Sequence, residues 1–240
     1  MQNSKKQEQD SVIEQNISYY DEIAGQYDAI LDKDTSNRIT REQVAEKFCE
    51  IISSGWVLDF GGGTGKDLEW LTEKGYRVIF CEPSDKMREK AMTFSRDILH
   101  RNDIVFLEDA TTDFTKWHEN IPFSQKTDAI LANFAVINSI PGINLLFQNL
   151  SLIIKPGGHL LMLVLRSNFK KRWTTNRRAA LFSLFTGFTV TTKIQFSGQK
   201  QTVYLHTIRK IKKATGGYFH FCSRRVVKES DFELIHMTRK

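Results

Sequence analysis

A glycine-rich segment directly after a short apolar run constrains this chain most. Residues 61–65 read Gly-Gly-Gly-Thr-Gly, and they follow the apolar run Trp56-Val57-Leu58-Asp59-Phe60. Glycines at this density weaken a helix or a strand, but they accept the backbone conformations of a tight turn. A strand that enters such a turn and then a helix directs free backbone N–H groups and the positive end of the helix at an anion. The segment therefore predicts an anion-binding turn, for either a pyrophosphate or a carboxylate.

From residue 56 onward, short apolar runs alternate with segments of helical periodicity. This alternation is typical of parallel β-α units. The segment Lys155-Pro156-Gly157-Gly158 predicts a tight turn, because proline fixes φ and glycine accepts positive φ. We expect helices at about 65–74, 84–99 and 142–154. We expect parallel strands at 56–60, 77–82, 103–108, 127–133 and 159–165.

The segments on either side of these units complete the expected fold. Residues 1–17 are polar and predict a flexible N-terminus, and apolar spacing predicts helices at 18–31 and about 38–52. An insertion or lid is expected at about 166–206. Its hairpin and the elements after it are expected at 188–196, 201–206, 207–215 (a helix), 218–227 and 232–238. The fold class is thus α/β, with a doubly wound, seven-stranded, mostly parallel sheet, an antiparallel last strand and N-terminal helices, in a single domain over 18–240.

Composition excludes several classes of protein. The cysteines Cys49, Cys81 and Cys222 have neither a C-x-x-C spacing nor a metal-ligand spacing, so no disulfide framework and no metal site are predicted. No signal peptide or membrane-spanning run is evident, which favours a cytoplasmic protein. Residues 1–154 hold 16 Lys and Arg against 25 Asp and Glu, whereas residues 155–240 hold 18 against 3. The basic second part indicates either an anionic partner or a solvated face.

The spacing within the glycine turn selects between nucleotide classes. The dinucleotide fingerprint G-x-G-x-x-G/A fails, because its last position would be Lys66 or Leu68. The pattern D-x-G-x-G-x-G fits from Asp59 to Gly65. In this the stretch resembles the class I methyltransferases that use S-adenosylmethionine (SAM). Further segments resemble the family in the same order, namely Tyr20 to Asp28, Glu82-Pro83-Ser84-Asp85-Lys86-Met87, Leu107 to Ala110, Asp128 to Phe134 and Leu150 to Gly158.

The resemblance implies a set of SAM-binding residues. Glu82 would bond the ribose hydroxyls, Asp109 would accept from the adenine amino group, and aromatic rings would favour the sulfonium by cation–π attraction. For single residues an ordinary role stays open: a turn residue at Asp59, a solvated acid at Glu82, core packing at Met87 and the aromatics, and a loop cap at Asp109. The implied cofactor-binding set is Tyr20, Tyr27, Asp59, Gly61, Gly63, Gly65, Glu82, Pro83, Met87, Asp109, Ala110, Asn133 and Phe134.

Methyl transfer from a sulfonium needs alignment and exclusion of water more than covalent catalysis. The sequence identifies no catalytic base, and His206 is only a weak candidate. Asn133-Phe134-Ala135-Val136 departs from the N/D-P-P-Y/F motif, which argues against amino groups of DNA bases or of glutamine as substrates. We expect transfer to a small-molecule or lipid-like acceptor. If this acceptor is anionic, the basic second part of the chain would suit it.

The segment 168–185, basic and then apolar, would act as a lid, a peripheral membrane contact or an RNA contact. An RNA methyltransferase, a non-catalytic nucleotide-binding regulator and an NAD-dependent oxidoreductase are the alternatives.

Overall fold

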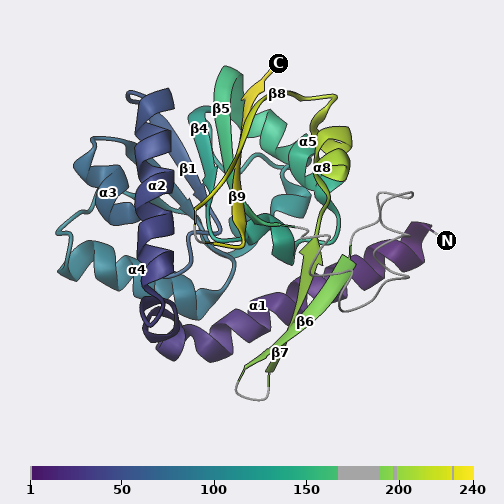
Figure 1. Cartoon of the computed structure of the whole chain (residues 1–240), viewed down its shortest axis with the longest axis horizontal. Coiled ribbons are helices and arrows are strands. Elements are labelled where there is room, and N and C mark those ends of the chain that lie inside the picture. Colours follow the sequence, from purple (N-terminus) through teal and green to yellow (C-terminus); the bar gives the residue numbers. More distant parts are fainter. Residues whose placement is uncertain (1, 167–189, 197–198, 229) are drawn as a thin grey trace.

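The computed structural model describes residues 2–166, 190–196, 199–228 and 230–240. Within them a seven-stranded sheet has the order β3-β2-β1-β4-β5-β9-β8 (Figure 1). Strands β1 to β5 pair in parallel, and β9 lies antiparallel between β5 and β8. This confirms the predicted sheet with a reversed last strand. The strands are β1 (Trp56–Phe60), β2 (Arg77–Cys81), β3 (Val105–Phe106), β4 (Thr127–Ala132), β5 (Ile154–Leu165), β8 (Phe219–Val226) and β9 (Phe232–Arg239).

Strand β5 begins earlier than the sequence predicted. The expected turn at residues 155–158 lies inside the strand, as a shift in register between the pairs Thr127–Ile154 and Ala129–His159. Gly157 has φ +76° there, which supplies the positive φ expected of that glycine. The proline and glycine pair therefore marks a bulge in β5.

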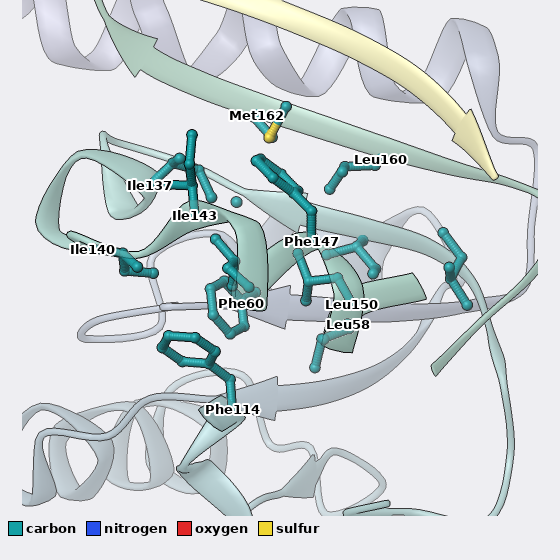
Figure 2. Packing of buried hydrophobic residues seen from close by; sticks show 14 of the residues in the cluster. Leu58, Phe60, Phe114, Ile137, Ile140, Ile143, Phe147, Leu150, Leu160 and Met162 are labelled. Atoms are coloured by element: carbon teal, nitrogen blue, oxygen red, sulfur yellow. The ribbon is translucent and has the colours of Figure 1, made fainter. Parts of the chain in front are cut away.

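Helices cover both faces of the sheet (Figure 1). On one face, helices α2 (Thr35–Ile51), α3 (Leu68–Glu73) and α4 (Asp85–Asp97) bury apolar side chains such as Phe48 and Leu71. On the other face, α5 (Ile143–Ile153) and α8 (Ile208–Thr215) pack on a second cluster. Figure 2 shows part of that cluster around Phe60 and Phe114, whose ring centres are 5.9 Å apart. Three short 3-10 helices connect strands: η1 (Asp109–Thr112), η2 (Phe114–Lys116) and η3 (Val136–Ser139).

The N-terminal helix is longer than the sequence predicted. Helix α1 spans Gln2–Asp32, so residues 2–17, expected to be flexible, form its first half. Asn16 is 4% exposed and donates to the carbonyl oxygen of Ser139 at 2.8 Å, and Ile13 packs on the core. The Asn16–Ser139 bond joins residues 123 positions apart, and both contacts stabilise a helix whose own sequence is polar.

A hairpin lies beside α1, outside the sheet (Figure 1). Strands β6 (Val190–Phe196) and β7 (Gln199–Leu205) pair antiparallel, close to the predicted hairpin. The basic and apolar segment 168–185 lies outside the described residues. No helix in the described part of the chain is both long and apolar enough to cross a bilayer.

Two histidines stack across strands β5 and β9 and predict a response to acid. The distance between His159 Nδ1 and His236 Nε2 is 3.1 Å. Burial, followed by His159, lowers the pKa of His236 to about 4, and burial also lowers the pKa of His159. Because both pKa values in the folded state lie below the unfolded value, stability is fully present above about pH 6.5 and is lost as the pH falls toward 4.

Replacing His236 by leucine is expected to remove part of this acid dependence. Between pH 6.5 and 4 the wild type should lose on the order of 1 to 2 kcal/mol more unfolding free energy than the variant. Urea denaturation across this range measures the difference, and His220→Leu, at an exposed position on β8, is the control. Parallel pH curves for the wild type and the His236 variant would contradict the prediction.

Candidate functional site

The glycine turn connects β1 to α3 at the carboxyl end of the sheet. Gly61, Gly63 and Gly65 have φ of +72°, +59° and +84°, which other residues rarely adopt. The N–H of Gly61 donates to the carbonyl oxygen of Cys81 at 2.7 Å, which ties the turn to the end of β2. A Cβ on Gly62 would lie 2.2 Å from Phe80 Cε2 and 2.6 Å from Asp59 Oδ2. Three positions of the turn therefore require glycine because of their positive φ, and Gly62 is required because a side chain there would clash.

Glu82 follows β2 and faces this turn. Its Oε2 accepts from the N–H of Gly63 and its Oε1 accepts from the N–H of Ser84, both at 2.9 Å. The residue is 6% exposed. Burial raises the pKa of Glu82 to about 7, although the two backbone N–H groups act in the opposite direction. A buried carboxylate with this pKa favours further hydrogen-bond donors, and the hydroxyl groups of a ligand are suitable donors.

A second acidic centre lies behind the turn. Asp67 pairs with Arg41 at 2.6 Å and accepts from Asn133 Nδ2 at 2.9 Å. Asp59 is 1% exposed, and neither carboxylate oxygen has a hydrogen-bond partner among the described residues. Burial, together with the nearby Asp67 carboxylate, raises the pKa of Asp59. Burial therefore favours the protonated, neutral form of Asp59, and Arg41 balances the charge of Asp67.

The glycine turn, Glu82 and Asp67 border a cavity of about 470 Å³. Its size is typical of a small-molecule or cofactor site. Of the residues predicted from the sequence, nine line the cavity: Tyr20, Tyr27, Gly61, Gly63, Glu82, Pro83, Met87, Asn133 and Phe134. The structure thus brings together residues from α1, the glycine turn, the end of β2 and the end of β4.

Four predicted residues lie away from the lining. Asp59 is buried behind Gly62, and Gly65 packs close to Ala91 of α4. Asp109 and Ala110 are exposed in η1, where Asp109 has φ +46°. The side chains of Thr112 and Asp113, a few residues later, lie on the cavity wall instead. An adenine contact by Asp109 therefore stays a prediction.

The sequence did not indicate several lining residues. Arg41 and Asp67 meet only in the folded chain, and the Arg41 guanidinium carbon lies 4.5 Å from the Phe134 ring centre, so one ring face is covered. Thr64 donates to Asp28 Oδ1 at 2.5 Å. Both residues belong to segments that the family resemblance had marked, so a signal for this contact was present. No comparable signal marked Arg41.

His206 does not line the cavity as described. It is 2% exposed, and its Nε2 lies 3.0 Å from the carbonyl oxygen of Ile140. Burial, then the charge of Lys210, lowers the pKa of His206 to about 4. The imidazole is therefore neutral at physiological pH and bonded to backbone, and its suggested role as a base gains no geometric support.

A family model described as a methyltransferase domain matches residues 34–219. The chain belongs to this methyltransferase family. With that match and the glycine turn, it is a SAM-dependent methyltransferase of class I. Its structure is similar to that of DhpI in complex with S-adenosylhomocysteine (SAH), with a TM-score of 0.66 at 16% identity over 95% of this chain and 96% of the other.

Two further solved structures share the fold. A SAM-dependent methyltransferase from Clostridium acetobutylicum has a TM-score of 0.62 at 14% identity, over 91% of this chain and 98% of that one. The glycopeptide N-methyltransferase MtfA, complexed with SAH, has a TM-score of 0.62 at 13% identity, over 84% and 90%. No curated protein sequence matches the chain. Identities this low establish the fold alone.

Proposed function

We propose that the cavity under α1 binds SAM and that the methyl group passes to a small or lipophilic acceptor held beside it. The observation that carries this proposal is the junction of Gly63 and Glu82, where a backbone cradle and a buried carboxylate share one hydrogen bond. In this placement Glu82 accepts from the ribose hydroxyls, and the glycine turn receives the methionine end. A Cβ on Gly63 would have only Tyr27 near it, at 3.8 Å, so that position opens onto the cavity.

The residues fit this cofactor in charge as well. SAM carries a carboxylate as well as a sulfonium and an ammonium group, and the ion pair of Asp67 with Arg41, at 2.6 Å, lies on the cavity wall near the glycine turn. Arg41 lines the same wall and offers a partner for a carboxylate. SAM supplies an activated methyl group for an in-line displacement. The protein's part is to hold both reactants in line and to exclude water.

The tyrosines on α1 contribute as neutral groups. Burial raises the pKa of Tyr20 and of Tyr27 well above the ordinary value. Both phenols therefore stay protonated at physiological pH and donate hydrogen bonds rather than accept a proton. An acceptor that arrives deprotonated or as a free amine fits such a site, because no described lining residue is established as its base.

The acceptor class is supported by the enclosure of the site. Helix α1 lines the cavity, the hairpin packs on α1, and MtfA, which shares the fold, is named for a glycopeptide acceptor. An RNA strand needs a longer open groove.

The described cysteines Cys49, Cys81 and Cys222 are unpaired. This supports a reducing compartment, such as the cytoplasm, as the place of work.

The proposal is tested by transfer of a labelled methyl group from SAM. We expect label in small molecules from a mixed panel of phenols, carboxylic acids and amines. Label in total RNA would favour an RNA methyltransferase. SAM binding without any SAH formation, across the panel, RNA and lipid vesicles, would instead support a non-catalytic regulator.

A further inference from the structure

The hairpin β6–β7 contacts α1 directly through paired hydrogen bonds. Asn16 Nδ2 donates to the carbonyl oxygens of Ser139 at 2.8 Å and Thr202 at 3.1 Å, and the N–H of Thr202 donates back to Asn16 Oδ1 at 3.0 Å. All three residues are at least half-buried. A side-chain amide that bonds a strand backbone in both directions fixes the register between helix and hairpin. Residues next to Thr202 are therefore held at a set position over α1.

Gln201 uses this position to contact the cavity wall. Its side chain is buried with the residue 7% exposed, and its Nε2 donates to the Tyr20 hydroxyl oxygen at 2.7 Å. The Tyr20 oxygen is thus an acceptor toward the hairpin, so its own hydrogen points elsewhere. Among the described residues nothing accepts that hydrogen. Tyr20 is also one of the residues that line the cavity.

The backbone of Tyr20 lies about two helical turns before that of Tyr27 on α1. Tyr27 lies beside Gly63, and Tyr20 lies seven residues earlier on the same helix. At about 1.5 Å per residue this is a rise of about 10 Å toward β7 and η3. Tyr20 meets Tyr27 edge to face, with ring centres 6.1 Å apart, which fixes the ring of Tyr20. Helix α1 thus holds both rings on the side that lines the cavity.

We propose that Gln201 is a positioning residue for the methyl acceptor, holding Tyr20 so that its hydroxyl donates a hydrogen bond to an oxygen or neutral nitrogen atom of the acceptor. This inference rests on the proposed function. The atom that Tyr20 contacts is next to the methylated atom and is not itself the nucleophile, since a donated hydrogen bond weakens a nucleophile. Good acceptors therefore carry a second lone-pair atom near the reacting group, as a hydroxy acid with its ionised carboxylate does.

Gln201→Glu is the decisive variant, because it keeps the size of the side chain and reverses the hydrogen bond. A carboxylate at this position takes the Tyr20 hydrogen and withdraws it from the cavity. We expect Gln201→Glu and Tyr20→Phe each to raise KM for the acceptor about three- to tenfold, with kcat and the Kd for SAM within about twofold of wild type, which is the loss of one hydrogen bond. Lys200→Gln, which lowers the net charge by the same one unit at an exposed neighbour, should leave KM unchanged.

The acceptor probe is the fastest substrate for SAH formation by the wild-type chain among catechol, salicylate, 2-phenylethanol and benzylamine. The double variant should equal the worse single variant, because both remove the same interaction. Three outcomes overturn the proposal: unchanged KM in Gln201→Glu, a fall in SAM affinity of tenfold or more in both single variants, or a preference for probes without a second lone-pair atom. Failure of the proposed function is distinct, since the wild type itself would then bind no SAM or form no SAH.

Discussion

Glu82→Gln is expected to weaken SAM binding at least about 100-fold, because two hydrogen bonds to a charged acceptor contribute about 1.5 to 3 kcal/mol each. One of the two backbone N–H groups that donate to Glu82 also loses its acceptor, because the amide nitrogen of glutamine only donates. Titration calorimetry with SAM at pH 8 measures the loss. Glu119→Gln, an exposed position at the edge of the same cavity, is the matched control and should bind SAM within about twofold of wild type.

The same variant should also change how stability depends on pH. Burial raises the pKa of Glu82 from 4.5 to about 7 in the folded chain. Between these two values the folded state binds more protons than the unfolded state, so stability is fully present below about pH 4.5 and is lost as the pH rises through 7. The loss amounts to about 3 kcal/mol by pH 8. In Glu82→Gln this slope should be absent from urea denaturation curves.

Two results would contradict this account of Glu82. If Glu82→Gln bound SAM with the affinity of the wild type, Glu82 would not contact the ribose. If the unfolding free energy of wild type and that of Glu82→Gln changed by the same amount between pH 4.5 and 8, folding would not shift the pKa of Glu82. The histidine pair acts in the opposite direction below pH 6.5, so the comparison is made as a difference between the two proteins.

Gly62→Ala is expected to lower the free energy of unfolding by about 2 to 3 kcal/mol, as overpacking in a rigid core does. The new methyl group would overlap the Phe80 ring at 2.2 Å, and Phe80 is fully buried against Phe106. Gly62 has no positive φ, so the effect is steric. Gly63→Ala separates the two causes, since space is free there but φ is +59°, and it should lower stability by about 1 to 2 kcal/mol.

Gly25→Ala is the control for glycine replacement. Gly25 lies within α1, and a Cβ there meets nothing within 4 Å. The exchange should raise stability by about 0.5 to 1 kcal/mol through helix propensity. Thermal and urea denaturation of the three variants check the order. A Gly62 variant as stable as wild type would show that Phe80 and Asp59 have more freedom than their burial indicates.

The sequence predicted the sheet because each strand carries its own local signal. Short apolar runs at 56–60 and 77–81 are buried on both faces, and glycine or proline ends them, so neither boundary depends on a distant partner. The first half of α1 had no such signal. Its polar residues form a helix because Asn16 and Ile13 meet η3, β7 and the core, which are contacts that no local pattern encodes.

The candidate site likewise combines residues that local sequence determines with residues that only tertiary contacts bring together. Gly61, Gly63 and Glu82 were predictable, since a strand end and a required backbone conformation determine them. Arg41 and Asp67 were not, because an ion pair between α2 and the residue before α3 arises only in the folded chain. The role of Gln201 depends on a hairpin that packs on α1, where Gln201 contacts a residue 181 positions away in sequence, and a single sequence does not reveal that pairing.

The central claim is that the glycine turn and Glu82 hold SAM, and ligand-induced stabilisation tests it most directly. A ligand at 100 times its Kd stabilises the native state by about 2.7 kcal/mol. Thermal denaturation of the full chain with SAM, SAH or NAD should therefore show a rise in Tm of several degrees with SAM and SAH and none with NAD, and Glu82→Gln should abolish the rise. A rise with NAD and none with SAM or SAH would contradict the account.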